Sequence, residues 1–224
     1  MLFRSASLLR QIPNAALGGV LLFVALRIIR VGQIASIFRQ SRGEFLLILL
    51  TAAGIIILPI EQGVGIGIAL SLLHGIWSTT RARILVFERV SGTTIWWPSS
   101  SNLPGEREPG IIVAGFQAPL SFLNAYHFRS DILAALKSSP QKTQLLVLEA
   151  TGIVEIDFTA AQVLTDLIRR CHADGVDFAI ARLESVRALD AMKRFGVCDL
   201  LGPDHVFQSV DEAIKALGKR DSTG

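Results

Sequence analysis

Hydrophobic residues form continuous runs in the first third of the chain and follow a periodic pattern in the rest. Three stretches contain no charged residue: residues 11–26, 45–60 and 62–80, which are 16, 16 and 19 residues long. A helix needs ~20 apolar residues to cross the ~30 Å hydrocarbon core of a bilayer. We therefore predict three short membrane helices within residues 1–80, suited to packing beside other helices.

An amphipathic segment separates the first two stretches. In residues 31–41, Val31, Ile34 and Phe38 fall on one face of a helix, whereas the polar residues fall largely off that face. Such a helix can lie in the membrane surface with its apolar side toward the acyl chains. We predict an interfacial helix at about residues 31–41.

The third stretch carries small residues at a helical spacing. Gly63, Gly67, Ser71 and Gly75 are four residues apart, so they share one face of a helix. Small residues let two helix backbones approach closely inside a membrane, where packing drives association. We predict that these four residues form a helix-packing face.

Charge is distributed unevenly between the two parts of the chain. Hydrophobic residues make up 50% of the sequence and charged residues 18%, and the mean hydropathy is +0.48. Residues 1–85 contain eight Arg, no Lys and two acids, a net charge of +6, whereas residues 86–224 have a net charge of −3. The basic excess lies among apolar runs, so it does not indicate nucleic-acid binding. The pattern excludes a disordered chain and a single soluble globule.

The arginines predict the orientation of the membrane segment. Four of them lie between the first and second apolar stretches and two follow the third: Arg27, Arg30, Arg39 and Arg42, then Arg81 and Arg83. Cytoplasmic loops carry an excess of Lys and Arg. We therefore predict a multi-pass protein of the cell (inner) membrane, in which the second and third stretches form a hairpin and the C-terminal domain is cytoplasmic.

The rest of the chain alternates between strand and helix patterns. We expect a juxtamembrane connector at residues 81–92, a folded domain at 93–220 with a loop at 99–110, and a disordered tail at 221–224. Short strands alternating with helices predict a small α/β sandwich, in which helices pack on a sheet. Asn124 is expected to cap one helix, and Ser209 with Glu212 to form a capping box for the last.

Candidate chemistry is sparse. The four histidines are scattered, and Cys171 and Cys198 are 27 residues apart with no CxxC pair. Because neither a nucleophile–base arrangement nor a metal-binding spacing results, we predict no enzymatic activity, no metal and no cofactor. Trp96 and Trp97 follow the last apolar stretch closely, so they either anchor at the membrane interface or pack on the sheet edge.

One segment resembles a known domain. Residues 145–164, LLVLEATGIVEIDFTAAQVL, contain a strand, a turn at Gly152 and then Asp157-Phe158-Thr159-Ala160 at the start of a helix. The segment resembles the STAS domain, shared by anti-sigma-factor antagonists and by the cytoplasmic tails of SulP anion permeases. The family motif is Asp-Ser-Ser/Thr-Gly, and its third residue is the hydroxyl phosphorylated in the antagonists. The resemblance assigns that regulatory position to Thr159 and the motif's acid to Asp157.

Two residues depart from that motif. Phe158 replaces a small polar residue and Ala160 replaces the glycine, at the place where a kinase would need access. An aspartate before a helix also caps its unpaired N–H groups and favours the positive end of its dipole. Capping by Asp157 is therefore favoured over signalling chemistry.

Residues 116–129, FQAPLSFLNAYHFR, resemble the STAS version of SulP permeases. The apolar segments before them are similar in order to the last membrane helices of those permeases, so the resemblance covers almost the whole chain. It implies the C-terminal portion of a secondary transporter of sulfate-like anions, unable to transport alone. The implied partners are the lipid bilayer, the remaining permease helices if supplied, and a second copy or another protein bound through the STAS domain. The alternative is a membrane-tethered regulatory module that resembles an anti-sigma-factor antagonist, with Thr159 as its switch.

Overall fold

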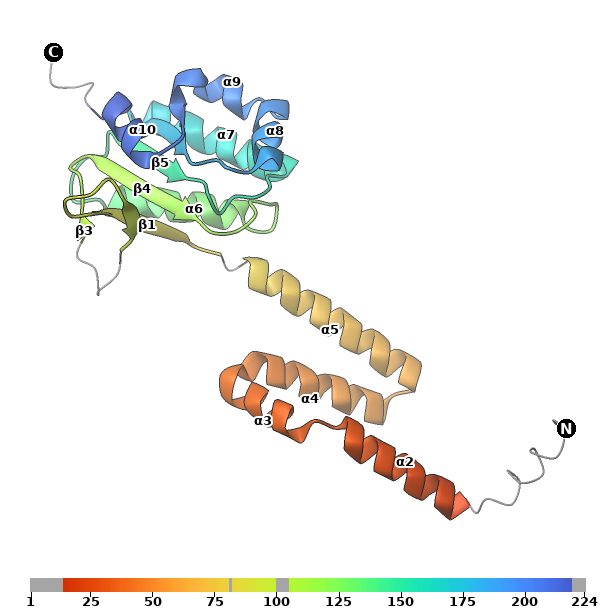
Figure 1. The fold of residues 1–224 in the computed structure, drawn as a ribbon. Helices are drawn as coiled ribbons and strands as arrows, with labels where there is room; N and C mark the ends of the chain where they lie inside the picture. Colours follow the sequence, from red (N-terminus) through yellow and green to blue (C-terminus); the bar gives the residue numbers. More distant parts are fainter. Residues whose placement is uncertain (1–13, 81, 100–104, 219–224) are drawn as a thin grey trace, which may run out of the picture. The chain divides into compact units, whose positions relative to one another are not determined.

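The computed structural model describes residues 14–80, 82–99 and 105–218 (Figure 1). The chain divides into two compact units, up to Leu73 and from His74 onward. The helices are α2 (Asn14–Ile28), α3 (Val31–Gln40), α4 (Arg42–Ile57), α5 (Ile60–Thr80), α6 (Ala125–Ser138), α7 (Phe158–Ala173), α8 (Val186–Arg194), α9 (Val197–Leu201) and α10 (Val210–Leu217), with a 3-10 turn at Pro203–His205. The strands are β1 (Ile84–Val90), β2 (Trp96–Pro98), β3 (Gly105–Glu106), β4 (Ile111–Phe116), β5 (Leu145–Glu149), β6 (Asp177–Ala181) and β7 (Val206–Phe207). Arg81, the middle of the loop predicted at 99–110 and the tail predicted at 221–224 lie outside the described residues.

Helices α2, α4 and α5 are apolar on all sides. Their large side chains are widely exposed: Leu21 is 70% exposed, Ile56 83% and Leu72 64%. A helix that is hydrophobic all round belongs in a membrane or in the interior of a larger assembly. By length and composition, the segments Ala15–Gln40 and Ile60–Ser78 are able to cross a membrane, whereas α4 has only 16 residues. Three membrane spans therefore stay a prediction.

Helix α3 covers the segment predicted to be amphipathic, and it folds back on α4. The Ser41 N–H donates to the carbonyl of Ile37 at 2.7 Å, and the Ser41 hydroxyl accepts from the Glu44 N–H at 3.4 Å. The rings of Phe38 and Phe45 meet edge to face, with centroids 4.8 Å apart, an arrangement that aromatic pairs prefer. Ser41 and the aromatic pair together fix the corner between α3 and α4.

The second unit is built on one sheet with the strand order β2-β1-β4-β5-β6-β7, and β3 also pairs with β1. Strands β4 to β7 are parallel, whereas β1 is antiparallel to each of its neighbours. Ile84 of β1 pairs with Phe116 of β4, and Phe87 with Val113. The connector predicted at residues 81–92 therefore contains a strand of the folded unit, because β1 pairs with a strand more than twenty residues further along the chain.

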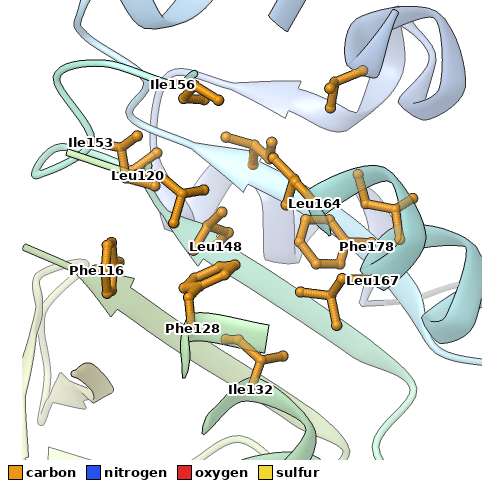
Figure 2. Packing of buried hydrophobic residues seen from close by; sticks show 14 of the residues in the cluster. Phe116, Leu120, Phe128, Ile132, Leu148, Ile153, Ile156, Leu164, Leu167 and Phe178 are labelled. Atoms are coloured by element: carbon orange, nitrogen blue, oxygen red, sulfur yellow. The ribbon is translucent and has the colours of Figure 1, made fainter. Parts of the chain in front are cut away.

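Helices cover both faces of the parallel strands, as their nearly continuous apolar sequences require. On one face, Phe116, Leu148 and Phe178 come from three neighbouring strands and pack with Phe128 of α6 and Leu164 of α7 (Figure 2). Phe116 and Phe128 are fully buried, and their rings meet edge to face with centroids 5.2 Å apart. This core holds α6 and α7 against the sheet. The candidate site lies beside the first turns of these two helices.

A second, smaller core lies on the opposite face. Phe87 and Val113 belong to it, together with Ile214 of α10. Trp96 packs against this core, whereas its neighbour Trp97 is 56% exposed. Since successive strand residues point to opposite faces, only Trp96 packs on the sheet edge.

The predicted helix starts are partly confirmed. Ser209 accepts from the Glu212 N–H at 3.1 Å and so caps α10 as predicted, whereas the Glu212 carboxylate accepts at 3.2 Å from the N–H of Gln208, the residue before the cap, and not from that of Ser209 as a capping box requires. Asn124 precedes α6, but its side chain makes no bond to the helix. The prediction of an Asn124 side-chain cap was wrong, because its amide turns back to the preceding loop.

Candidate functional site

The loops at the carboxyl ends of the parallel strands form the candidate site. They are residues 117–124 after β4, residues 150–157 after β5 and residues 182–185 after β6. Parallel strands place these ends at one edge of the sheet, where ligands of open α/β folds usually bind. The motif residues Asp157 and Thr159 lie there, at the start of α7.

Asp157 joins two of these loops through both oxygens of its carboxylate. Oδ1 accepts from the Ala160 N–H at 2.8 Å and so caps α7. Oδ2 accepts from the Phe122 N–H at 2.7 Å, across 35 positions of sequence. The capping predicted for Asp157 is confirmed, and its bond to the loop after β4 was not predicted.

The backbones of the same two loops are also bonded. The Leu120 N–H donates to the Glu155 carbonyl at 2.9 Å, and the Asp157 N–H donates to the Leu120 carbonyl at 3.2 Å. Gly152 fits where a side chain would not, since an added Cβ would lie 2.6 Å from Gln117 Cα. The turn predicted at Gly152 therefore brings the loop after β5 against the loop after β4.

Asn124 stiffens the first loop from within. It is fully buried, its Oδ1 accepts from the Ser121 N–H at 2.9 Å, and its Nδ2 donates to the Pro119 carbonyl at 2.9 Å. Both polar groups of the buried amide are thus paired, as buried polar groups must be to avoid a desolvation penalty. The Asn124 amide fixes the loop that presents the Phe122 N–H to Asp157.

Glu149 ends β5 and is only 4% exposed. The Thr151 hydroxyl donates to its carboxylate, and a guanidinium nitrogen of Arg182 lies 3.6 Å from the same oxygen. Arg182 has a φ of 57°, in the left-handed region that residues other than glycine rarely adopt. This conformation places a counter-charge beside Glu149, whose burial would otherwise be costly. The signal for this pair in the amino-acid sequence is a single acid at the end of an apolar strand.

Thr159 is the second helical residue of α7 and is half-buried. Phe158 beside it is 61% exposed, and its ring meets that of Phe195 edge to face with centroids 5.6 Å apart. The Ser185 hydroxyl donates to the Val154 carbonyl at 2.6 Å, so the loop after β6 joins the other two. The loops thus form a rigid surface with Thr159 at its border.

Each of these loops, or the helix start that follows it, carries an exposed apolar side chain. These side chains belong to residues from three loops or adjoining helix starts and are 41–72% exposed: Phe122, Val154, Phe158 and Val186.

The predicted helix-packing residues Gly63, Gly67, Ser71 and Gly75 all lie in α5, but their surroundings differ. A Cβ on Gly63 would lie 2.7 Å from Ile55 Cα, and a Cβ on Gly67 would lie 2.6 Å from Thr51 Cγ2. Both glycines therefore face α4 of the same chain. A Cβ on Gly75 would meet nothing within 4 Å, and Ser71 is exposed.

Metal or cysteine chemistry has little support. In the ranges that the structure describes, no three His, Cys, Asp or Glu side chains gather to hold a metal ion. Cys171 and Cys198 are not joined by a disulfide. Burial, with a smaller contribution from Asp174, raises the pKa of the Cys171 thiol to about 11, which makes it unreactive near neutral pH.

Comparison with known proteins agrees with the fold and extends it. The STAS domain model matches residues 103–213. A probable sulfate transporter of Mycobacterium tuberculosis is 32% identical over 224 residues, which cover 98% of this chain and 39% of the relative. Solute carrier family 26 member 10 of Mus musculus is 23% identical over 199 residues, 86% of this chain and 29% of the relative.

A solved structure shares the fold over both units. The murine solute carrier 26 family member A9 anion transporter, in its inward-facing state, matches with a TM-score of 0.79 at 20% identity. The match covers 92% of this chain and 34% of that protein. The predicted order, apolar helices followed by a STAS domain with helices packed on a mixed sheet, is confirmed. The chain thus carries a STAS domain and matches the C-terminal part of SulP/SLC26 transporters, over about two fifths of the length of the probable sulfate transporter.

Proposed function

We propose that the chain supplies scaffold helices and the regulatory STAS domain of a secondary transporter for sulfate-like anions. The observation that carries the proposal is the continuous match to a probable sulfate transporter over 98% of the chain, from the apolar helices through the sheet. The relatives are described as transporters, which agrees with a chain that is not an enzyme. The exposed apolar surface of α2, α4 and α5 supports the same function, because it needs lipid or further helices to cover it.

In this proposal α2, α4 and α5 cross the inner membrane and the STAS domain lies in the cytoplasm. Arg27, Arg30, Arg39 and Arg42 surround α3, on the side that the positive-inside rule assigns to the cytoplasm. The loop between α4 and α5 carries no basic residue, and Glu61 follows it. The proposed partners are the bilayer, further permease helices, and a second copy or another protein at the STAS domain.

The chain by itself is not proposed to transport. Anion sites of inverted-repeat carriers are built where discontinuous helices point their N-termini at the substrate near the bilayer midplane. Among the described residues of α2, α4 and α5, the ionisable side chains lie in the end turns, apart from His74 in α5. These helices therefore suit a scaffold around such a site better than the site itself.

Exchange of the C-terminal part of a relative tests the proposal. The matching region of the Mycobacterium tuberculosis probable sulfate transporter is replaced by this chain, and labelled sulfate uptake is measured in cells that lack their own sulfate uptake. The controls are the relative truncated before that region and this chain expressed alone, each with its membrane content quantified. The proposal expects saturable uptake only by the hybrid. Uptake by this chain alone, or none by a hybrid that is inserted and monodisperse, contradicts it.

Regulation through Thr159 is proposed within the same function. Its support is the half-buried hydroxyl at the start of α7, where a phosphate would face the positive end of the helix dipole. In the hybrid, Thr159→Glu is expected to change the uptake rate and Thr159→Val to leave it near the original. Equal rates for both variants would assign Thr159 a structural role only. A membrane-tethered module without transport predicts instead that no hybrid transports.

A further inference from the structure

Helix α3 is the only amphipathic element among the described apolar helices α2 to α5. Val31 is 68% exposed and Phe38 55%, on the apolar side of the helix. On the polar side, Gln40 donates to the Ser36 hydroxyl at 3.0 Å. Since the Ser41 cap and the Phe38–Phe45 pair fix the corner with α4, the polar side has a defined position next to the apolar spans.

Four arginines flank this helix in two pairs. Arg27 lies in the last turn of α2 and Arg30 precedes α3, while Arg39 lies in the last turn of α3 and Arg42 begins α4. The two pairs are separated by the nine positions from Arg30 to Arg39, about 14 Å along the helix axis. The helix thus presents two cationic ends around an amphipathic body.

None of these four arginines forms an ion pair in the part of the chain that the structure describes, and all four are exposed. The contrast with the STAS domain is clear, because Arg89, Arg107 and Arg182 there each pair with a carboxylate. The first 85 residues contain only two acids, Glu44 and Glu61. The four charges are therefore available to an external anion.

An amphipathic helix with basic residues at its ends matches the chemistry of an anionic lipid surface. The apolar side contacts the acyl chains, and each guanidinium donates two parallel N–H bonds to a pair of phosphate oxygens. A basic residue at an anionic surface strengthens binding by about fivefold. A free phosphate or sulfate would engage the arginines but gain nothing from the apolar side.

We propose that α3 and its four flanking arginines bind the phosphate headgroups of anionic phospholipids. The inference rests on the proposed function, in which α2 and α4 cross the membrane. It goes beyond that proposal because it states that α3 prefers anionic to neutral lipids. Each pair of arginines engages one or more headgroups. The corner between α3 and α4 is thereby fixed at the cytoplasmic leaflet.

Lipid binding to the full purified chain in a neutral mild detergent tests the inference. Phosphatidylglycerol and phosphatidylcholine are titrated separately, and bound lipid is counted by native mass spectrometry. The wild-type chain is expected to bind phosphatidylglycerol more tightly than phosphatidylcholine. This preference should fall as the salt concentration rises from about 0.05 to about 0.5 M, because the Debye length shortens over this range. Equal binding of the two lipids overturns the inference.

Variants locate the binding. Arg30→Gln with Arg39→Gln should weaken phosphatidylglycerol binding by about 25-fold, from fivefold for each charge. The matched pair Arg169→Gln and Arg187→Gln removes two exposed arginines of the STAS domain and should leave the binding unchanged. Arg30→Lys with Arg39→Lys should retain most of the preference, which separates loss of charge from loss of folding. An unchanged preference in the Gln pair, or an equal loss in the STAS pair, overturns the inference.

Two further arms separate the possible sources of failure. Excess inorganic phosphate or sulfate should not displace the lipid, and displacement by either would assign the arginines to a free anion. Carbonate washing of native membranes reports insertion independently. A chain that resists the wash but shows no lipid preference keeps the proposed function and loses this inference, whereas a chain that is extracted loses both.

Discussion

Asp157 is expected to stabilise the STAS domain through two bonds that can be removed one at a time. Its carboxylate caps α7 at 2.8 Å and accepts from the Phe122 N–H at 2.7 Å. Asp157→Ala removes both bonds. Asp157→Asn retains one acceptor oxygen, so one of the two bonds remains. Its amide nitrogen replaces the other oxygen, so the second backbone N–H faces another donor and loses its bond.

The magnitudes follow from the two bonds. Loss of a helix N-cap costs about 0.5–2 kcal/mol. Loss of a hydrogen bond to a charged group costs about 1.5–3 kcal/mol. We expect Asp157→Ala to lower the free energy of unfolding by about 2–5 kcal/mol, and Asp157→Asn by roughly half of that.

Urea unfolding of residues 82–218, followed by far-UV circular dichroism, measures these values. With an m-value of about 2 kcal/mol per M, the Ala variant should shift the midpoint down by about 1–2.5 M. Asp166→Asn is the matched control, because Asp166 lies on the same helix, is 59% exposed and is 3.9 Å from its arginine partner. A loss for Asp157→Ala no greater than for Asp166→Asn would refute the two-loop role of Asp157.

Three further results are expected. Gly67→Ala should lower the thermal stability of the chain in detergent, because the added Cβ would lie 2.6 Å from Thr51 Cγ2. The control Gly65→Ala should not, because its Cβ would meet nothing within 4 Å. Equal stabilities of the two variants would contradict the packing of Gly67 against α4. At pH 8 a maleimide should label Cys198 before the buried Cys171, because a pKa of about 11 leaves about one Cys171 thiol in a thousand ionised. Prompt labelling of Cys171 would contradict its burial in the larger hydrophobic core. A chain of residues 82–218 should elute as a folded monomer or dimer, whereas residues 93–218 should aggregate, because they lack β1 and leave an edge of β4 unpaired; a folded shorter chain would contradict the sheet order.

Local features of the STAS domain could be predicted from sequence. Asp157 precedes an apolar periodic run, and Ser209 stands three residues before Glu212, so both caps follow from short-range spacing. The continuous apolar runs before residue 80 likewise indicate a membrane segment without knowledge of any contact. These predictions depend only on residues within one or two helical turns of each other.

Features that depend on distant partners could not be predicted in the same way. The Phe122 N–H reaches Asp157 only after the sheet has aligned two loops, and Arg182 reaches Glu149 only in an unusual backbone conformation. Asn124 looks like a cap by position but is drawn into its loop by two backbone partners. Spacing along one helix also could not show that Gly63 and Gly67 pack against α4 while Ser71 is exposed.

Side-specific labelling tests most directly whether the apolar helices cross the membrane and leave the STAS domain in the cytoplasm. In a chain with Cys198→Ser, Asp166→Cys places a thiol at an exposed position of α7, and a membrane-impermeant maleimide is applied to intact spheroplasts and to inside-out vesicles after a carbonate wash. The account predicts that the washed membranes retain the chain and that the new thiol is labelled only in inside-out vesicles. Labelling in intact spheroplasts, or release of the chain by carbonate, would contradict it.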